Sequence, residues 1–140
     1  MTRGRKRLDK LAERPVALRT RLPDSRESFT HHVNINGTDL YIIVGMYPDG
    51  APGEVFLKVG KVGSTLRGLL DILGIFTSLL LQVGMPIEDV CDKMIGVSFE
   101  PNGRTTNKDI LDCSSISDYV FRWLKLRFID SPQTQILKEE

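Results

Sequence analysis

The segment best suited to bind a ligand spans residues 57–67, where a strand-like stretch passes through two glycines into a helical pattern. Backbone N–H groups at the start of a helix lack partners and carry partial positive charge, so they favour a phosphate group. The candidate ligand-binding residues here offer amine, guanidinium, hydroxyl and bare backbone donors: Lys61, Gly63, Ser64, Thr65 and Arg67. Their spacing differs from that of a Walker loop. The alternative is an ordinary strand-to-helix turn in which Ser64 caps the helix.

A second candidate is the polar loop at residues 99–107. Loops of this kind often carry ligand contacts. Glu100 would accept a hydrogen bond from an exocyclic amine or a ribose hydroxyl, and Arg104 would pair with a second phosphate or a base edge. Thr105 completes the set of candidate ligand-binding residues. The alternative is a solvated loop without a ligand.

The sequence predicts no catalytic residue, no metal site and no cofactor. His31 and His32 point to opposite faces of a predicted strand and lack further ligands at a recognisable spacing. Glu54 would serve as a general base, but no nucleophile or second carboxylate accompanies it at a defined spacing. Cys91 and Cys113 have no partner cysteine or histidine at metal-ligand spacing, which fits a reducing cytoplasm.

Strands are expected mainly in the first half of the chain. Residues 29–35, 40–46 and 54–59 are rich in β-branched and aromatic residues, and the turn-forming residues 36–39 join the first two into a hairpin. Residues 97–99 are expected to form a further short strand. The sequence thus predicts an antiparallel meander.

Three helices are expected after the meander. The first begins at Ser64 and ends before Gly84, and it is apolar on nearly all sides, so it must be buried by the sheet and other helices or by a second subunit. The second has Pro86 in its first turn, and the third is capped by Ser115 and Asp118. The expected fold class is α+β: an antiparallel β-meander of about three strands packed on a long buried helix, with two further helices.

Charge is unevenly distributed along the 140 residues. Residues 1–21 carry eight Lys and Arg against two acids, whereas the remainder carries 11 basic residues against 16 acidic ones. We therefore expect a basic flexible N-terminal arm at 1–26, one domain at 27–130 and a C-terminal tail at 131–140. The arm would contact nucleic acid or an acidic surface, or act as a solubilising leader or a docking segment along the acidic body.

No segment resembles a secretion signal. The longest apolar run, residues 69–81, is shorter than the roughly 20 residues that a bilayer span needs. The run therefore indicates a core helix, and we expect a cytoplasmic protein without membrane contact.

Residues spread between positions 22 and 128 follow one collinear pattern. Its clearest parts are Leu22-Pro23-Asp24, Pro52-Gly53-Glu54, Gly63-Ser64-Thr65, Phe99-Glu100-Pro101 and Phe121-Arg122-Trp123-Leu124. This pattern resembles the TSCPD domain, the accessory domain at the C-terminal end of cobalamin-dependent ribonucleotide reductases. The resemblance implies an accessory module that binds a nucleotide, a cofactor or another chain.

Two departures from the reductases bear on activity. In those enzymes the domain follows a large barrel that carries the radical chemistry and the cobalamin site, and the family has a Cys-rich end; these residues include neither. Because the reaction needs a radical-bearing cysteine and a reducing pair, we expect no ribonucleotide reduction by this chain alone.

Three functions follow as hypotheses. The first is a non-catalytic module that binds a nucleotide or another phosphate-bearing ligand and forms a homo-oligomer through its long helix. The second is a small subunit that docks on a separate reductase catalytic chain, or on nucleic acid through residues 1–21. The third is a viral protein that sequesters nucleotide signals.

Overall fold

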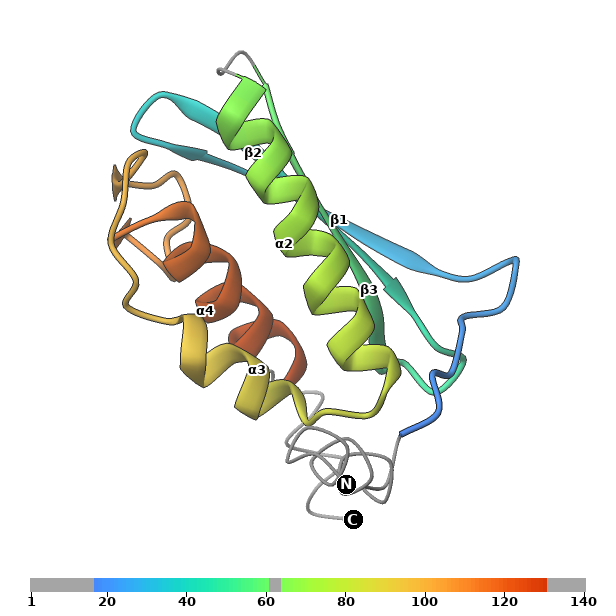
Figure 1. Cartoon of the computed structure of the whole chain (residues 1–140). Coiled ribbons are helices and arrows are strands. Elements are labelled where there is room, and N and C mark those ends of the chain that lie inside the picture. The colour runs from blue at the N-terminus through green and yellow to red at the C-terminus, as the bar shows by residue number, and fades with distance from the viewer. Residues whose placement is uncertain (1–16, 61–63, 131–140) are drawn as a thin grey trace, which may run out of the picture.

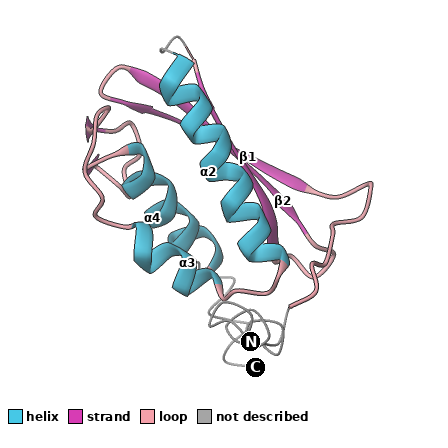
Figure 2. Cartoon of the chain, viewed as in Figure 1, coloured by secondary structure: helices cyan, strands magenta, loops and turns pink. Residues whose placement is uncertain are grey.

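The computed structural model describes residues 17–60 and 64–130 and contains the predicted meander. Its three antiparallel strands are β1 (Ser28–Ile35), β2 (Thr38–Met46) and β3 (Pro52–Val59), in the order β1-β2-β3 (Figures 1 and 2). Alternate side chains along each strand are buried, because successive residues point to opposite faces of a sheet. One face therefore carries the apolar core, and the other faces solvent.

The β1–β2 hairpin turns within two residues. Asn36 and Gly37 both have positive φ angles, 47° and 93°, and Ile35 pairs directly with Thr38. Asn-Gly favours this kind of two-residue connection because its twist matches that of the strands. The predicted connection at 36–39 is thus correctly located, although its last two residues belong to β2.

Three helices follow: α2 (Ser64–Gln82), α3 (Ile87–Met94) and α4 (Ile116–Phe128). The predicted α+β class is confirmed. Pro86 is the N-cap residue of α3 and lies just outside its first turn. The predicted cap of α4 is present, since the Ser115 hydroxyl accepts a hydrogen bond from the Asp118 amide at 2.9 Å.

The predicted strand at residues 97–99 is wrong. The Val97 carbonyl accepts hydrogen bonds from the Ser114 and Ser115 hydroxyls, so side chains occupy a position that a ladder would need. The paired strands in this region are instead β4 (Gly103–Arg104) and β5 (Asp112–Cys113). A bridge between Ile35 and Thr105 connects this loop to the end of β1.

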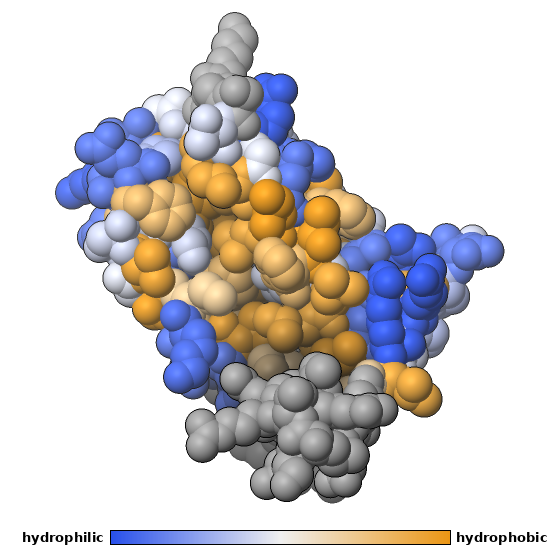
Figure 3. All heavy atoms as spheres, viewed as in Figure 1, coloured by the Kyte–Doolittle hydropathy of each residue, from blue (hydrophilic) through white to orange (hydrophobic). Residues whose placement is uncertain are grey.

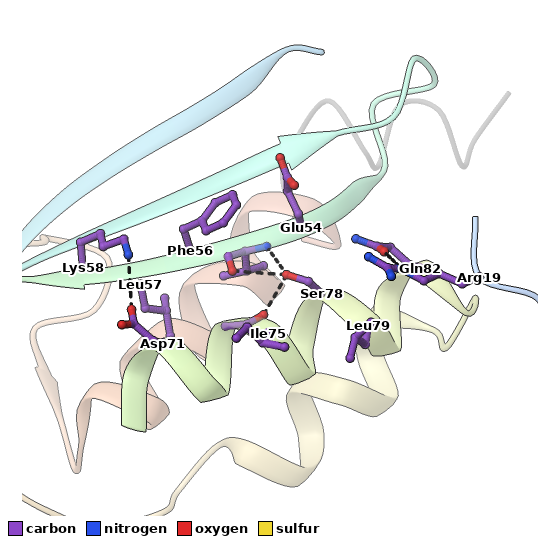
Figure 4. Close-up of a pocket in the computed structure, with 12 residues that line it drawn as sticks. Arg19, Glu54, Phe56, Leu57, Lys58, Asp71, Ile75, Ser78, Leu79 and Gln82 are labelled. Carbon is purple, nitrogen blue, oxygen red and sulfur yellow. Dashed lines mark hydrogen bonds and ion pairs between the residues drawn. The ribbon is translucent and has the colours of Figure 1, made fainter. Parts of the chain in front are cut away.

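A polar stripe on α2 binds the open edge of β3 (Figure 4). The Ser78 hydroxyl accepts a hydrogen bond from the Val55 amide at 2.8 Å, and the Gln82 side chain donates to the Gly53 carbonyl at 2.9 Å. Gly74 allows this close approach, because a Cβ there would lie 2.8 Å from the Val55 carbonyl oxygen. The helix therefore satisfies backbone groups that an edge strand leaves unpaired.

The three helices differ in how much of their surface is buried in the protein. The first half of α4, from Ile116 to Phe121, is completely buried and contacts β1 through Tyr119 and its neighbour Trp123. In contrast, α2 buries the side that faces β3 and exposes several large apolar side chains on the other. In Figure 1, α3 packs on α4.

The length and composition of α2 would suffice to cross a membrane, but only 28% of the apolar stretch Thr65–Gln82 is buried in the protein. Its hydrogen bonds to β3 through Ser78 and Gln82 show that it serves as a sheet-packed helix. A single helix of this kind does not indicate a membrane protein.

The contact between α2 and β3 predicts opposite effects of alanine at two α2 glycines. Alanine is the better helix former by about 1 kcal/mol, so Gly68→Ala, where a Cβ meets nothing within 4 Å, should raise the free energy of unfolding. Gly74→Ala should lower it by about 1–3 kcal/mol, because the new methyl group overlaps the Val55 carbonyl. Urea denaturation measures both changes, and equal stabilisation by the two variants would contradict the close packing.

Candidate functional site

A cavity of about 700 Å³ lies between the N-terminal half of α2, the start of α4 and the loop that precedes β4. Its walls are mostly apolar and are formed by Leu66, Leu69, Leu70, Leu73 and Phe99. Three polar side chains also line it: Thr65, Glu100 and Ser117. Thr65 belongs to the candidate segment at 57–67 and Glu100 to the candidate loop at 99–107, so the tertiary structure brings part of both candidates together.

A second cavity, of about 440 Å³, is also lined by Glu100. Its other lining residues are Asn36 and Thr38 of the β1–β2 hairpin and Pro101 and Asn102. This second cavity is the more polar of the two, so Glu100 lines both an apolar and a polar compartment. That arrangement suits a molecule with a ring at one end and polar groups at the other.

The Asp118 carboxylate fixes the loop that carries Phe99 and Glu100. It accepts hydrogen bonds from the Gly96 amide at 2.8 Å and the Ser114 amide at 3.1 Å, one at each end of the loop. Burial alone would raise the pKa of Asp118, but these amides and the Arg122 guanidinium outweigh it and hold the pKa below its usual value. The capping pattern predicted the backbone role of Asp118; its side-chain role depends on tertiary contacts that the pattern does not contain.

The remaining candidate residues do not line the apolar cavity. Lys61 and Gly63 lie outside the residues that the structure describes. Ser64 is the first residue of α2, and the structure does not describe its side chain. The Arg67 guanidinium is exposed and lies 3.4 Å from the Gly60 carbonyl.

Arg104 is free to contact a ligand, whereas the hydroxyl of Thr105 is used within its own loop. The exposed Arg104 lies next to the polar cavity, because its carbonyl accepts a hydrogen bond from the Asn36 amide at 2.8 Å. The Thr105 hydroxyl donates to the Ile110 carbonyl and accepts from the Asn107 amide, so it stabilises the loop.

Both cysteines are buried and free. Burial raises the pKa of Cys91 to about 11 and also raises the pKa of Cys113. Since the thiolate is the reactive form, both side chains are held as inert thiols. Within residues 17–60 and 64–130, no group of three His, Cys, Asp or Glu side chains could hold a metal ion.

A partly buried hydrogen-bonded chain, which no motif in the sequence indicates, links β1, α4 and the loop before β5. The Asn107 side chain donates to the Tyr119 hydroxyl at 2.9 Å, and that hydroxyl lies 2.7 Å from His31 Nε2. The Tyr119 hydroxyl keeps its own hydrogen after accepting from Asn107, and it donates that hydrogen to His31 Nε2 in the tautomer that leaves this nitrogen unprotonated. Burial lowers the pKa of His31 and raises that of Tyr119 to about 12, so both groups stay uncharged at neutral pH.

His31 makes the stability of the fold depend on pH. Its folded-state pKa is lower than the unfolded value of 6.5, so the unfolded chain binds more protons below that pH. The free energy of unfolding should therefore be fully retained above pH 6.5 and fall as the pH drops through 6.5 toward the folded-state pKa.

Urea denaturation between pH 8 and pH 5 measures this dependence. The variant His31→Gln should flatten the part of the curve just below pH 6.5. His32→Gln, on the solvent face of β1, should retain most of it, because burial is the larger cause of the lowered pKa of His31 and the charge of His32 is the smaller one. An unchanged curve for His31→Gln would contradict the assignment.

Comparison with known proteins gives one family. Residues 13–128 match the family model of the TSCPD domain. A vitamin B12-dependent ribonucleotide reductase of Rhodopirellula baltica is 46% identical over 111 residues, which are 79% of this chain and 11% of the relative. Reductases of the same description from Streptomyces avermitilis and Bradyrhizobium diazoefficiens are 42% and 35% identical and are covered to 13% and 10%. No solved structure matches.

Proposed function

This chain belongs to the TSCPD domain family, and on that premise we propose that it is a non-catalytic binding module related to the vitamin B12-dependent ribonucleotide reductases. It binds a nucleotide-like ligand in the cavity between α2 and the Phe99–Glu100 loop, associates with further copies of itself, and acts in the cytoplasm. The chain spans about a tenth to a fifth of the length of the curated relatives it matches. Their activity is therefore not assigned to it.

The paired cavities carry the proposal. The apolar compartment, at about 700 Å³, is within the size range of small-molecule sites and has leucines from α2 facing Phe99. A base stacks on such walls, and its exocyclic amine or the ribose donates to the Glu100 carboxylate. The polar compartment beyond Glu100 receives the sugar and phosphate, with Arg104 next to it.

The start of α2 offers a second position for a phosphate. Its first turn contains no acidic residue, so no carboxylate there repels an anion. Lys61, Gly63 and Ser64 remain part of the proposal as the residues that enter this turn, with Thr65 and Arg67 following. A ligand with more than one phosphate would use both positions.

The buried thiols support a binding role in place of a redox role. Cys91 and Cys113 each have a raised pKa, and thiol chemistry at neutral pH needs a thiolate. No described residue pairs a nucleophile with a base inside the cavity, whose polar groups are two hydroxyls and one carboxylate.

Calorimetric titration with nucleoside monophosphates, nucleoside triphosphates and cyclic nucleotides tests the ligand. Glu100→Gln should weaken binding about ten- to a hundredfold, because a hydrogen bond to a charged group contributes about 1.5–3 kcal/mol. Glu88→Gln removes an exposed carboxylate on α3 and should bind like the unchanged chain. Absence of heat with every nucleotide would remove the ligand from the proposal.

A reductase catalytic chain is the alternative partner, because the relatives reported above are reductases. If the chain docks on such an enzyme through its basic arm, deleting residues 1–21 should abolish co-purification with a B12-dependent reductase that lacks its own TSCPD domain. The same deletion should reduce binding to nucleic acid if the arm contacts phosphates. Unchanged co-purification after the deletion would argue against docking through the arm.

A further inference from the structure

An apolar seam runs along the exposed face of α2. It consists of four side chains of α2 and of Val83, which directly follows the helix, and these are spaced alternately three and four residues apart: Leu69, Ile72, Phe76, Leu79 and Val83. Their exposed fractions run from 36% to 61%, and Phe76 near the centre is the most exposed. Figure 3 shows apolar residues gathered over this helix and polar residues at the borders of the patch.

The seam is distinct from the side of α2 that packs on the protein. Residues Leu70, Gly74 and Leu81 lie on the buried side and face β3 and the core. A helix with one such buried side has no need of a second apolar side unless another surface covers it. The three-four spacing is that of the a and d positions of a coiled coil, which pack against another helix.

We infer that a second copy of this chain covers the seam, with the two α2 helices antiparallel around a two-fold axis at Phe76. This inference rests on the self-association in the proposed function. It names the seam as the surface of association and a two-fold axis as its symmetry. About that axis Phe76 meets its own copy, Ile72 meets Leu79, and Leu69 meets Val83. The seam is therefore self-complementary, as an interface between identical surfaces must be.

The size of the patch fits this occupant. The exposed parts of the seam and of the adjacent Ile75 amount to roughly 500 Å², near the upper end of what monomers expose. A stable dimer buries about 800 Å² on each partner. The half-buried Leu80 adjoins the seam and adds apolar area to it.

Charge favours a second copy over a lipid surface. Arg67 and Asp71 are the ionisable residues of α2, and they lie toward β3, where Arg67 approaches the Gly60 carbonyl and Asp71 pairs with Lys58 at 3.3 Å. A second copy thus brings no like charge to the seam. Helices that lie in a membrane surface are rich in Lys and Arg on their polar face, whereas the polar face of α2 is bound to β3.

The dimer would border the ligand cavity. Leu69 belongs both to the seam and to the cavity wall. In the two-fold pair, the partner's Val83 packs against Leu69 at the side of the cavity that is open to solvent. The second copy therefore narrows the entrance to the proposed ligand site.

Light scattering coupled to size-exclusion chromatography tests the interface. The full chain should elute at twice its 15.8 kDa mass at tens of micromolar, and Phe76→Glu should elute as a monomer. The control Leu111→Glu changes an apolar side chain that is 65% exposed and lies outside the seam, so it should remain dimeric. Circular dichroism confirms that both variants fold. A monomeric full chain, or dissociation by both substitutions, would overturn the inference.

Cysteine cross-linking tests the symmetry. Under oxidising conditions Phe76→Cys should form a disulfide with its own copy, because the axis brings the two Cα atoms within the roughly 7 Å that a disulfide spans. Leu69→Cys alone should not, but it should cross-link when mixed with Val83→Cys. The native cysteines are buried, so they add little background. A self-cross-link of Leu69→Cys would indicate parallel helices and overturn the arrangement.

Separate outcomes would contradict the proposed ligand site and the proposed dimer. Phe76→Glu is also titrated with nucleotides, and binding by this monomer leaves the ligand site in place whatever the oligomeric state. A monomeric unchanged chain that binds nucleotides would overturn the dimer alone. A dimer that binds none would overturn the ligand site alone.

Discussion

The attachment of α2 to the edge of β3 is the constraint on which the rest of the structure depends. Ser78 and Gln82 bond the backbone of the strand, and Gly74 lets the helix approach it closely. This contact fixes the rotation of the helix about its axis. Since a helix is rigid, the same rotation turns Phe76 and its neighbours outward and directs Leu66 and Leu70 to the cavity. The proposed interface and the proposed ligand site therefore both depend on the contact between α2 and β3.

A second fixed point is the buried start of α4. Asp118 joins the two ends of the loop between α3 and α4 through the Gly96 and Ser114 amides. The loop therefore holds Phe99 at the cavity that the leucines of α2 also line. Contacts with β3 fix the position of α2, and contacts with the loop fix the start of α4. The side chains between these two helices do not fill the space there, and this unfilled space is the cavity.

The predictions from sequence were most accurate where local rules decide the outcome. Stretches rich in β-branched and aromatic residues located β1, β2 and β3, Asn36-Gly37 located the hairpin turn, and Ser115 located the start of α4. The strand expected at residues 97–99 failed because hydroxyls from Ser114 and Ser115, distant in sequence, bond the carbonyl of Val97. A run of apolar residues does not by itself indicate whether another strand lies close enough to pair with it.

The sequence by itself therefore determined the meander, the three helices, the family pattern and two polar segments that suit a ligand. Only the tertiary structure decided that Thr65 and Glu100 line one cavity, that Thr105 supports its loop, and which side of α2 faces solvent. The physical reason is that α2 is apolar on nearly all sides, so periodicity gives no preferred orientation. Ser78 and Gln82 select the orientation by bonding to an edge strand that Gly74 lets the helix approach, and that contact forms only when the chain has folded.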